Sequence, residues 1–144
     1  MTNELIGKIK SRGYWRIVIR PQKFNKHLIP SLDQCLQYIA ASKVSLRGWD
    51  YPHVDREGYA NGIDWVESAT DWMDILEYWR FYQSGQFANI FNCREDWVDL
   101  NQEQFMRLVN KPFPDGVLGV VATIYRLTEI YEFAARLASG SGLG

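Results

Sequence analysis

The sequence predicts an α+β fold, a single antiparallel β-sheet with helices packed on a face. Residues 12–20 alternate apolar and polar side chains, two aromatic-rich runs flank Ser84-Gly85, and three other segments repeat apolar residues at helical spacing. The expected order of elements is β-α-β-β-β-β-α-α, and this arrangement buries one face of the sheet under the helices.

Length and composition are those of one globular domain. The chain has 144 residues, of which 47% are hydrophobic and 23% charged, close to the globular averages of about 45–50% and about 25%. We expect one domain over residues 1–139 and a flexible linker or tail at 140–144. Cys35 and Cys93 form no metal-binding pattern, no apolar run is long enough to span a membrane, and no secretory leader is visible. These features predict a cytoplasmic location.

The first strand is expected over residues 12–20. One face carries Trp15, Ile17 and Ile19. The opposite face carries Arg12, Tyr14, Arg16, Val18 and Arg20. Pro21 ends the strand because proline has no amide hydrogen to donate to the ladder. A helix follows, since Ser31 and Gln34 have the spacing of a capping box.

Four further strands are expected in the middle of the chain. They cover Val44–Trp49 and residues 63–70, 75–83 and 87–93. The last two form a hairpin about Ser84-Gly85. The run 75–83 has aromatic residues on both faces, which predicts a strand covered on both sides. A helix over residues 72–82 is the alternative that the same residues allow.

Two helices complete the expected fold, over residues 100–110 and 116–139. In the longer helix one apolar stripe recurs at spacings of three and four, and we expect it to cover the sheet. The stripe comprises Val117, Val120, Ile124, Leu127, Tyr131, Ala134 and Ala138. The apolar residues outside it predict an interface with a second copy or a second domain. They are Leu118, Val121, Tyr125 and Phe133. Alternatively, helix 100–110 folds back and buries them within one chain.

Charge is distributed unevenly along the chain. Residues 1–48 carry nine basic and two acidic residues, whereas residues 49–103 carry three basic and twelve acidic ones. Either the two segments neutralise each other across the sheet, or the basic segment has an anionic partner. The acidic residues expected to face the first strand in the former case are Glu67, Asp71, Asp74 and Glu77.

Arginine and aromatic side chains form the predicted ligand-binding set. Arg47, Trp49 and Tyr51 fall on one side of an extended segment, where a guanidinium beside two aromatic rings can hold a phosphate and stack a base. Ordinary core packing accounts for the same aromatic residues. The complete set is Arg12, Tyr14, Arg16, Arg20, Arg47, Trp49 and Tyr51.

Asp50, His53 and Asp55 are the weaker alternative, because they could ligate a divalent cation or share a proton. A turn closed by Asp50 and Pro52 accounts for them equally well. No GxSxG, HExxH or phosphate-loop motif occurs, so no catalytic residue, metal or cofactor is assigned.

We therefore expect a non-enzymatic binding, interaction or sensor domain that uses an arginine and aromatic sheet face. Its expected partner is a nucleotide, a nucleic acid or an acidic protein, with no membrane, and the last helix is expected to contact a second copy or domain. The alternatives are a metal-dependent phosphodiesterase or nuclease-like enzyme and a self-assembling structural protomer. The stretches LRGWDYPHV, EYWRFYQSGQF and YRLTEIYEFAARLA resemble segments of bacterial proteins, a resemblance that implies no activity.

Overall fold

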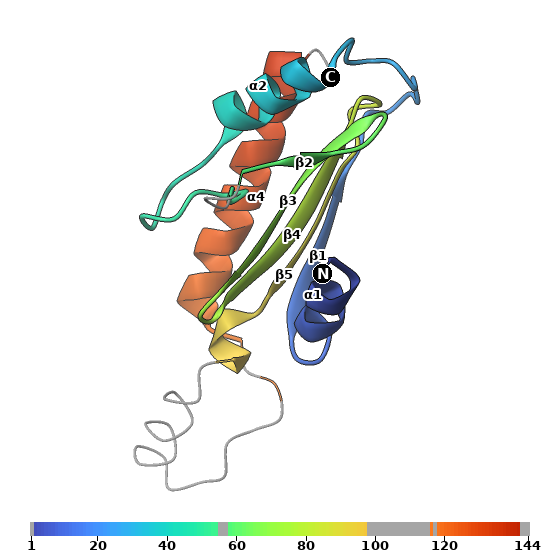
Figure 1. The fold of residues 1–144 in the computed structure, drawn as a ribbon. Coiled ribbons are helices and arrows are strands. Elements are labelled where there is room, and N and C mark those ends of the chain that lie inside the picture. Colours follow the sequence, from blue (N-terminus) through green and yellow to red (C-terminus); the bar gives the residue numbers. More distant parts are fainter. Residues whose placement is uncertain (1, 55–57, 98–115, 117, 142–144) are drawn as a thin grey trace, which may run out of the picture.

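The sheet of the α+β prediction is confirmed. A computed structural model describes residues 2–54, 58–97, 116 and 118–141. Five antiparallel strands lie in the order β1-β5-β4-β3-β2 (Figure 1). The elements are α1 (Thr2–Ile9), β1 (Tyr14–Ile19), α2 (Leu32–Ser42), β2 (Ala60–Asn61), β3 (Trp65–Trp72), β4 (Ile75–Tyr82), β5 (Phe87–Asn92), the 3-10 helix η1 (Arg94–Asp96) and α4 (Val120–Ser141). The predicted helix over 100–110 lies outside the described residues.

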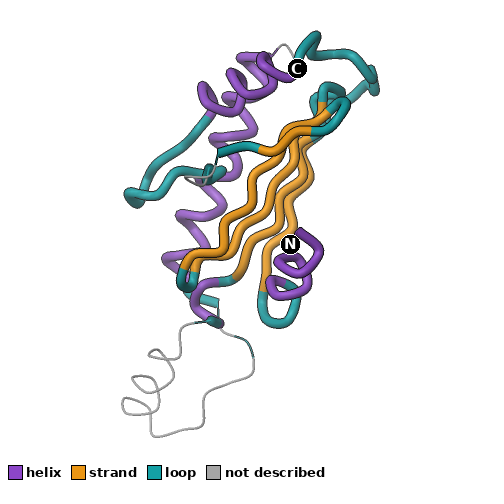
Figure 2. Tube along the Cα trace, in the orientation of Figure 1, coloured by secondary structure: helices purple, strands orange, loops and turns teal. Residues whose placement is uncertain are grey.

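The sheet combines a local meander with one long-range strand. Strands β2 to β5 pair with their neighbours in the chain, whereas β1 pairs with β5, so that Tyr14 lies opposite Asn92 and Ile19 opposite Phe87. Figure 2 shows the resulting twisted sheet, with α2 and α4 on one side and α1 on the other. We call the side covered by α2 and α4 the inner face and the opposite side the outer face.

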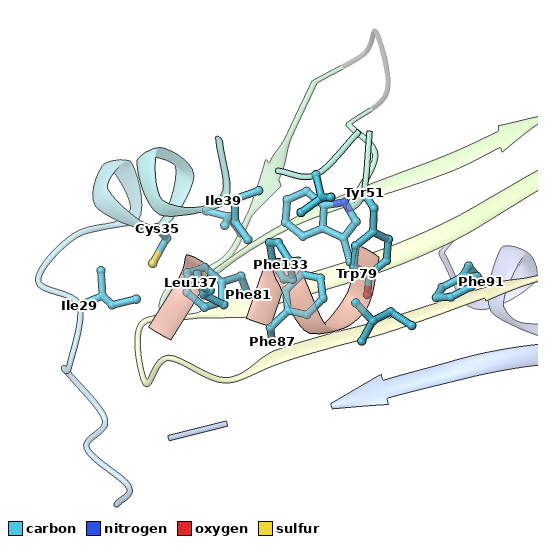
Figure 3. Packing of buried hydrophobic residues seen from close by; sticks show 13 residues of the cluster. Ile29, Cys35, Ile39, Tyr51, Trp79, Phe81, Phe87, Phe91, Phe133 and Leu137 are labelled. Atoms are coloured by element: carbon cyan, nitrogen blue, oxygen red, sulfur yellow. The ribbon is translucent and has the colours of Figure 1, made fainter. Parts of the chain in front are cut away.

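The main core lies between the inner face and α4. Phe133 of α4 is fully buried and contacts Tyr51 edge-on, with ring centroids 5.5 Å apart, and Phe87 at 4.8 Å (Figure 3). Trp79 and Phe81 of β4 belong to the same cluster. Burying these large aromatic side chains removes apolar surface from water and so stabilises the fold.

A smaller core lies on the outer face under α1, a helix that the sequence analysis did not predict. Leu5 and Ile9 of α1 pack against Leu76 and Ile90. An eight-residue helix is marginal on its own, so its stability depends on this packing, which a local pattern does not reveal. Because the two cores lie on opposite faces, the prediction that strand 75–83 is covered on both sides is confirmed.

Local signals located most of the elements. Ser31 caps α2, because its hydroxyl accepts a hydrogen bond from Gln34 N at 3.2 Å. The hairpin about Ser84-Gly85 forms as predicted. The predicted strand Val44–Trp49 is wrong, since only one bridge forms there, between Val44 and Tyr51. Gly48 within it has φ +75°, outside the extended region of a strand.

The orientation of α4 differs from the prediction. Most of the described residues of the stripe expected to cover the sheet are exposed to solvent, with Ile124 60% and Tyr131 73% exposed, while Ala134 and Ala138 are partly buried. The buried side instead carries Glu129, Ile130, Phe133 and Leu137. Phe133 therefore belongs to the core and not to an exposed interface. Apolar periodicity selected the wrong side because the buried side includes a charged residue.

The helix α4 continues through Gly140 and Ser141, the first residues of the predicted tail. Within the described ranges, no helix combines the length and apolar character needed to cross a membrane.

Candidate ligand-binding site

A pocket of about 620 Å³ lies between the first turns of α4, the loop that follows α2, and the ends of β3, β4 and β5. We call it the α4 pocket. Its aromatic lining includes Trp15, Trp49, Trp72 and Phe91. Its charged lining comprises Arg47, Arg94 and Arg126 with Asp74, Glu77 and Glu95. Its volume lies within the range of about 300–1,000 Å³ that is typical of small-molecule sites.

Stacked rings form one wall of the α4 pocket. Trp49 lies 3.8 Å from His53 and 5.8 Å from Trp72 between ring centroids, and the two indole planes are within 2° of parallel. Trp72 is the outer member of this stack and remains half exposed. A planar group entering the pocket therefore meets a flat aromatic surface.

Arg126 projects from the buried side of α4 into the same pocket. Its guanidinium lies 4.5 Å above the ring of Phe91. A guanidinium has five N–H donors; the described part of the chain supplies one acceptor, Glu129 Oε2, at 3.5 Å. Burial lowers the pKa of Arg126 below its usual value. The pocket thus contains a largely buried cation whose charge is offset by Glu129 and Glu77 but whose N–H donors are mostly unused in the described part of the chain.

Glu129 is nearly inaccessible to solvent and is occupied elsewhere. Arg47 holds it with two hydrogen bonds, from Nε at 3.2 Å and from Nη2 at 2.7 Å. Such a bidentate pair neutralises the buried carboxylate. At the rim of the pocket, Arg94 pairs with Asp74 at 2.6 Å. Of the three arginines, Arg126 therefore has the weakest hydrogen bond to a carboxylate in the described part of the chain.

Glu77 lies on β4 at the bottom of the α4 pocket and is buried. Its Oε1 accepts a hydrogen bond from Asn89 Nδ2 at 3.0 Å, and its Oε2 accepts one from His53 N at 3.3 Å. Asn89 Oδ1 in turn accepts from the Tyr51 hydroxyl at 3.1 Å. Burial raises the pKa of Glu77 to about 7, although Arg126 acts in the opposite direction. Near neutral pH this carboxyl is therefore partly protonated, which reduces its repulsion of a bound anion.

The structure divides the predicted ligand-binding set between the two faces of the sheet. Arg47 and Trp49 line the α4 pocket, whereas Tyr51 is fully buried in the main core. Tyr14, Arg16 and Arg20 lie on the outer side of β1 or just beyond it. Arg12 donates to Asp96 O and lies 5.2 Å from the ring of Trp97. These residues therefore do not form one continuous binding surface.

The acidic residues expected to face the first strand do not pair with it in the described part of the chain, although the basic and acidic segments do meet at Lys8–Asp71 and at Arg12–Asp96. Those acidic side chains bind other partners: Glu67 pairs with Arg80, Asp71 with Lys8, Asp74 with Arg94, and Glu77 bonds to Asn89. The reason is topological, since β1 lies next to β5 and is separated from β3 by two strands.

Two residues of the alternative metal site, Asp50 and His53, have other contacts. Asp50 lies 3.6 Å from Lys43, and His53 is stacked on Trp49. Asp55 lies outside the described residues. Among the residues that the structure describes, no group of three or more acidic, histidine or cysteine side chains is placed to hold a metal ion.

The remaining predicted interface residues differ in their surroundings. Leu118 is exposed but lines the α4 pocket. Val121 and Tyr125 are exposed, and Arg47 lies 5.9 Å from the Tyr125 ring. Sequence reasoning missed Arg126, Glu77 and Trp72 as site residues. A basic and an acidic residue three positions apart, Arg126 and Glu129, in a mostly apolar helix are the local signal that could have indicated a buried charged site.

Comparison with known protein families, with curated proteins and with solved structures finds no match to this chain.

Proposed function

We propose that this domain binds a small planar anion in the α4 pocket, such as an aromatic carboxylate or a mononucleotide. The observation that carries the proposal is Arg126, a largely buried guanidinium that faces the pocket with a single long hydrogen bond. Anions that accept two parallel N–H bonds from arginine gain both strength and orientation from that geometry.

The aromatic wall determines the expected shape of the ligand. Trp72 presents a half-exposed ring at the end of the stack with Trp49 and His53. A planar ring stacked there would place an attached carboxylate or phosphate near the arginines of the lining. Partial protonation of Glu77 favours the same ligand, because it removes a negative charge from the bottom of the pocket.

Isothermal titration calorimetry with benzoate, indole-carboxylate, a mononucleotide and inorganic phosphate tests the proposal. We expect at least one planar anion to bind, inorganic phosphate to bind more weakly, and Arg126→Gln to weaken binding about tenfold or more. Arg16→Gln is the matched control, since it makes the same change on the outer face and should leave affinity unaltered. Circular dichroism confirms that both variants are folded.

Two results would contradict the proposal. One is the absence of binding by every planar anion up to about 1 mM, a free energy of roughly −4 kcal/mol. The other is an equal loss of affinity in Arg126→Gln and Arg16→Gln, because the binding would then depend on the overall charge of the domain and not on the pocket.

A further inference from the structure

Strand β1 forms one edge of the sheet. It is six residues long, pairs with β5 on one side, and has no strand on its other side among the described residues (Figure 1). Natural edge strands are usually short, bulged, covered, interrupted by proline or protected by charged side chains. The opposite edge, β2, is only two residues long. The β1 edge is a longer strand protected by the positive charge of Arg16, which repels basic partners and not acidic ones.

Every second residue of β1 points its backbone N–H and C=O groups toward this free edge. Gly13 O accepts a hydrogen bond from Cys93 N at 2.8 Å, which fixes the phase of the ladder with β5. In an antiparallel pair, every second residue bonds to the partner strand. Residues 15, 17 and 19 therefore bond to β5. The N–H and C=O groups of Tyr14, Arg16 and Val18 point away from the sheet.

The inner side of β1 is incompletely covered. Trp15, Ile17 and Ile19 pack against the main core, yet each remains partly exposed because no strand lies beside them in the described part of the chain. Apolar side chains of an additional strand would cover these three residues and remove them from water.

The outer side of β1 carries uncompensated positive charge. Within the described part of the chain, neither Arg16 nor Arg20 forms an ion pair, and the acidic side chains of β3 and the β3–β4 turn are already paired with other residues. No acidic residue occurs between Glu4 and Asp33, while Lys23 and Lys26 follow Arg20. The charged side chains that a partner meets along this segment of the chain are therefore all basic.

We propose that β1 binds an extended acidic peptide as a sixth strand of the sheet. Main-chain hydrogen bonds to Tyr14, Arg16 and Val18 would supply affinity, and the two rows of side chains would supply specificity. The matching peptide alternates acidic residues, which face Arg16 and Arg20, with apolar residues, which cover the inner row. Direct pairing of two copies through β1 is disfavoured, because it would bring arginines of both copies onto one face of the sheet.

Fluorescence anisotropy with labelled peptides tests this inference on the full chain. The probe is an eight-residue peptide of alternating glutamate and valine. Three comparison ligands are a lysine and valine peptide of the same pattern, the glutamate peptide with a central proline, and a single-stranded oligothymidylate. We expect the glutamate peptide to bind about tenfold or more tightly than each of the three.

Two pairs of variants distinguish strand addition from binding through charge alone. Val18→Pro removes an amide that points to the free edge, so the fold should persist while peptide affinity falls about tenfold or more. Ile17→Pro removes an amide that bonds to β5 and should unfold or destabilise the sheet. Arg16→Glu should weaken binding to a similar extent, whereas Arg136→Glu, the same change on α4, should not.

Hydrogen exchange and the affinities of the variants test strand addition independently of ligand binding in the α4 pocket. Increased protection of the amides of residues 14, 16 and 18 from hydrogen exchange on adding the glutamate peptide would support strand addition. Unchanged affinity in folded Val18→Pro, tighter binding of the oligothymidylate, or no binding of the glutamate peptide up to about 1 mM would overturn the inference. Arg126→Gln should retain peptide binding, so failure of one proposal leaves the other intact.

Discussion

Glu77 should make the stability of the domain depend on pH over a defined range. Its pKa is raised from 4.5 to about 7 by burial on the inner face of the sheet. The folded state therefore binds this proton more tightly than the unfolded chain does. The group favours folding fully at pH values below about 4.5, and this contribution is lost as the pH rises toward about 7.

The size of the effect follows from the shift. A change from 4.5 to about 7 corresponds to about 3 kcal/mol, since each pKa unit is worth about 1.4 kcal/mol. Part of that change is complete at pH 5, so about 2 to 3 kcal/mol should be lost between pH 5 and pH 8. Glu77→Gln, which resembles the protonated side chain, should lack this loss.

Urea unfolding followed by tryptophan fluorescence at pH 5, 6, 7 and 8 measures the effect. Wild type and Glu77→Gln share all other titrating groups, so the difference between their unfolding free energies isolates Glu77. We expect Glu77→Gln to gain about 2 to 3 kcal/mol relative to wild type over this range. A difference that stays constant with pH to within about 0.5 kcal/mol would refute the reasoning, because Glu77 would then have an ordinary pKa.

Three further changes probe the fold. Phe133→Ala should cost about 3–5 kcal/mol because it empties a fully buried site, whereas Tyr131→Ala, on the exposed side of α4, should change stability by about 0.5 kcal/mol or less; similar losses in chemical denaturation would show that α4 is wrongly oriented. Ser31→Ala should cost about 1 kcal/mol through loss of the α2 cap, and an unaltered melting temperature would argue against that hydrogen bond. Met73 has φ +52° in the two-residue β3–β4 turn, so Met73→Gly should raise stability by up to about 1 kcal/mol; a lower melting temperature would show that the turn is unstrained.

Local patterns were sufficient to predict the elements whose signals are contained in a few residues. The alternation in β1, the cap at Ser31 and the glycine turn between β4 and β5 each depend on neighbours in the chain. The orientation of α4, in contrast, could not be predicted from local patterns. Its buried side carries Glu129, which is neutralised by Arg126 of the same helix and, through two shorter hydrogen bonds, by Arg47, more than 80 residues earlier. The spacing of apolar residues in the helix gives no indication of the ion pair with Arg47.

The candidate site was predictable only in part for the same reason. The sequence predicted Arg47 and Trp49 as ligand-binding residues because an arginine lies close to an aromatic residue, and both line the α4 pocket. The other residues of the pocket come from α4 and from several strands and turns of the sheet, and they meet only when the helix lies across the sheet. The separation of Arg16 from Arg47 likewise follows from strand order, which a one-dimensional pattern leaves open.

The strand order also bears on how the chain reaches its native state. Strands β3, β4 and β5 are joined by short turns, whereas Tyr14 of β1 must find Asn92 across most of the chain. Closing a long loop costs more entropy than closing a hairpin, so long-range pairing tends to be the slower step. The three-stranded meander is therefore the natural nucleus, and the N-terminal strand joins it late. Because β1 pairs with β5 alone, its detachment leaves the β3–β5 meander paired, so opening of this side of the sheet should begin there.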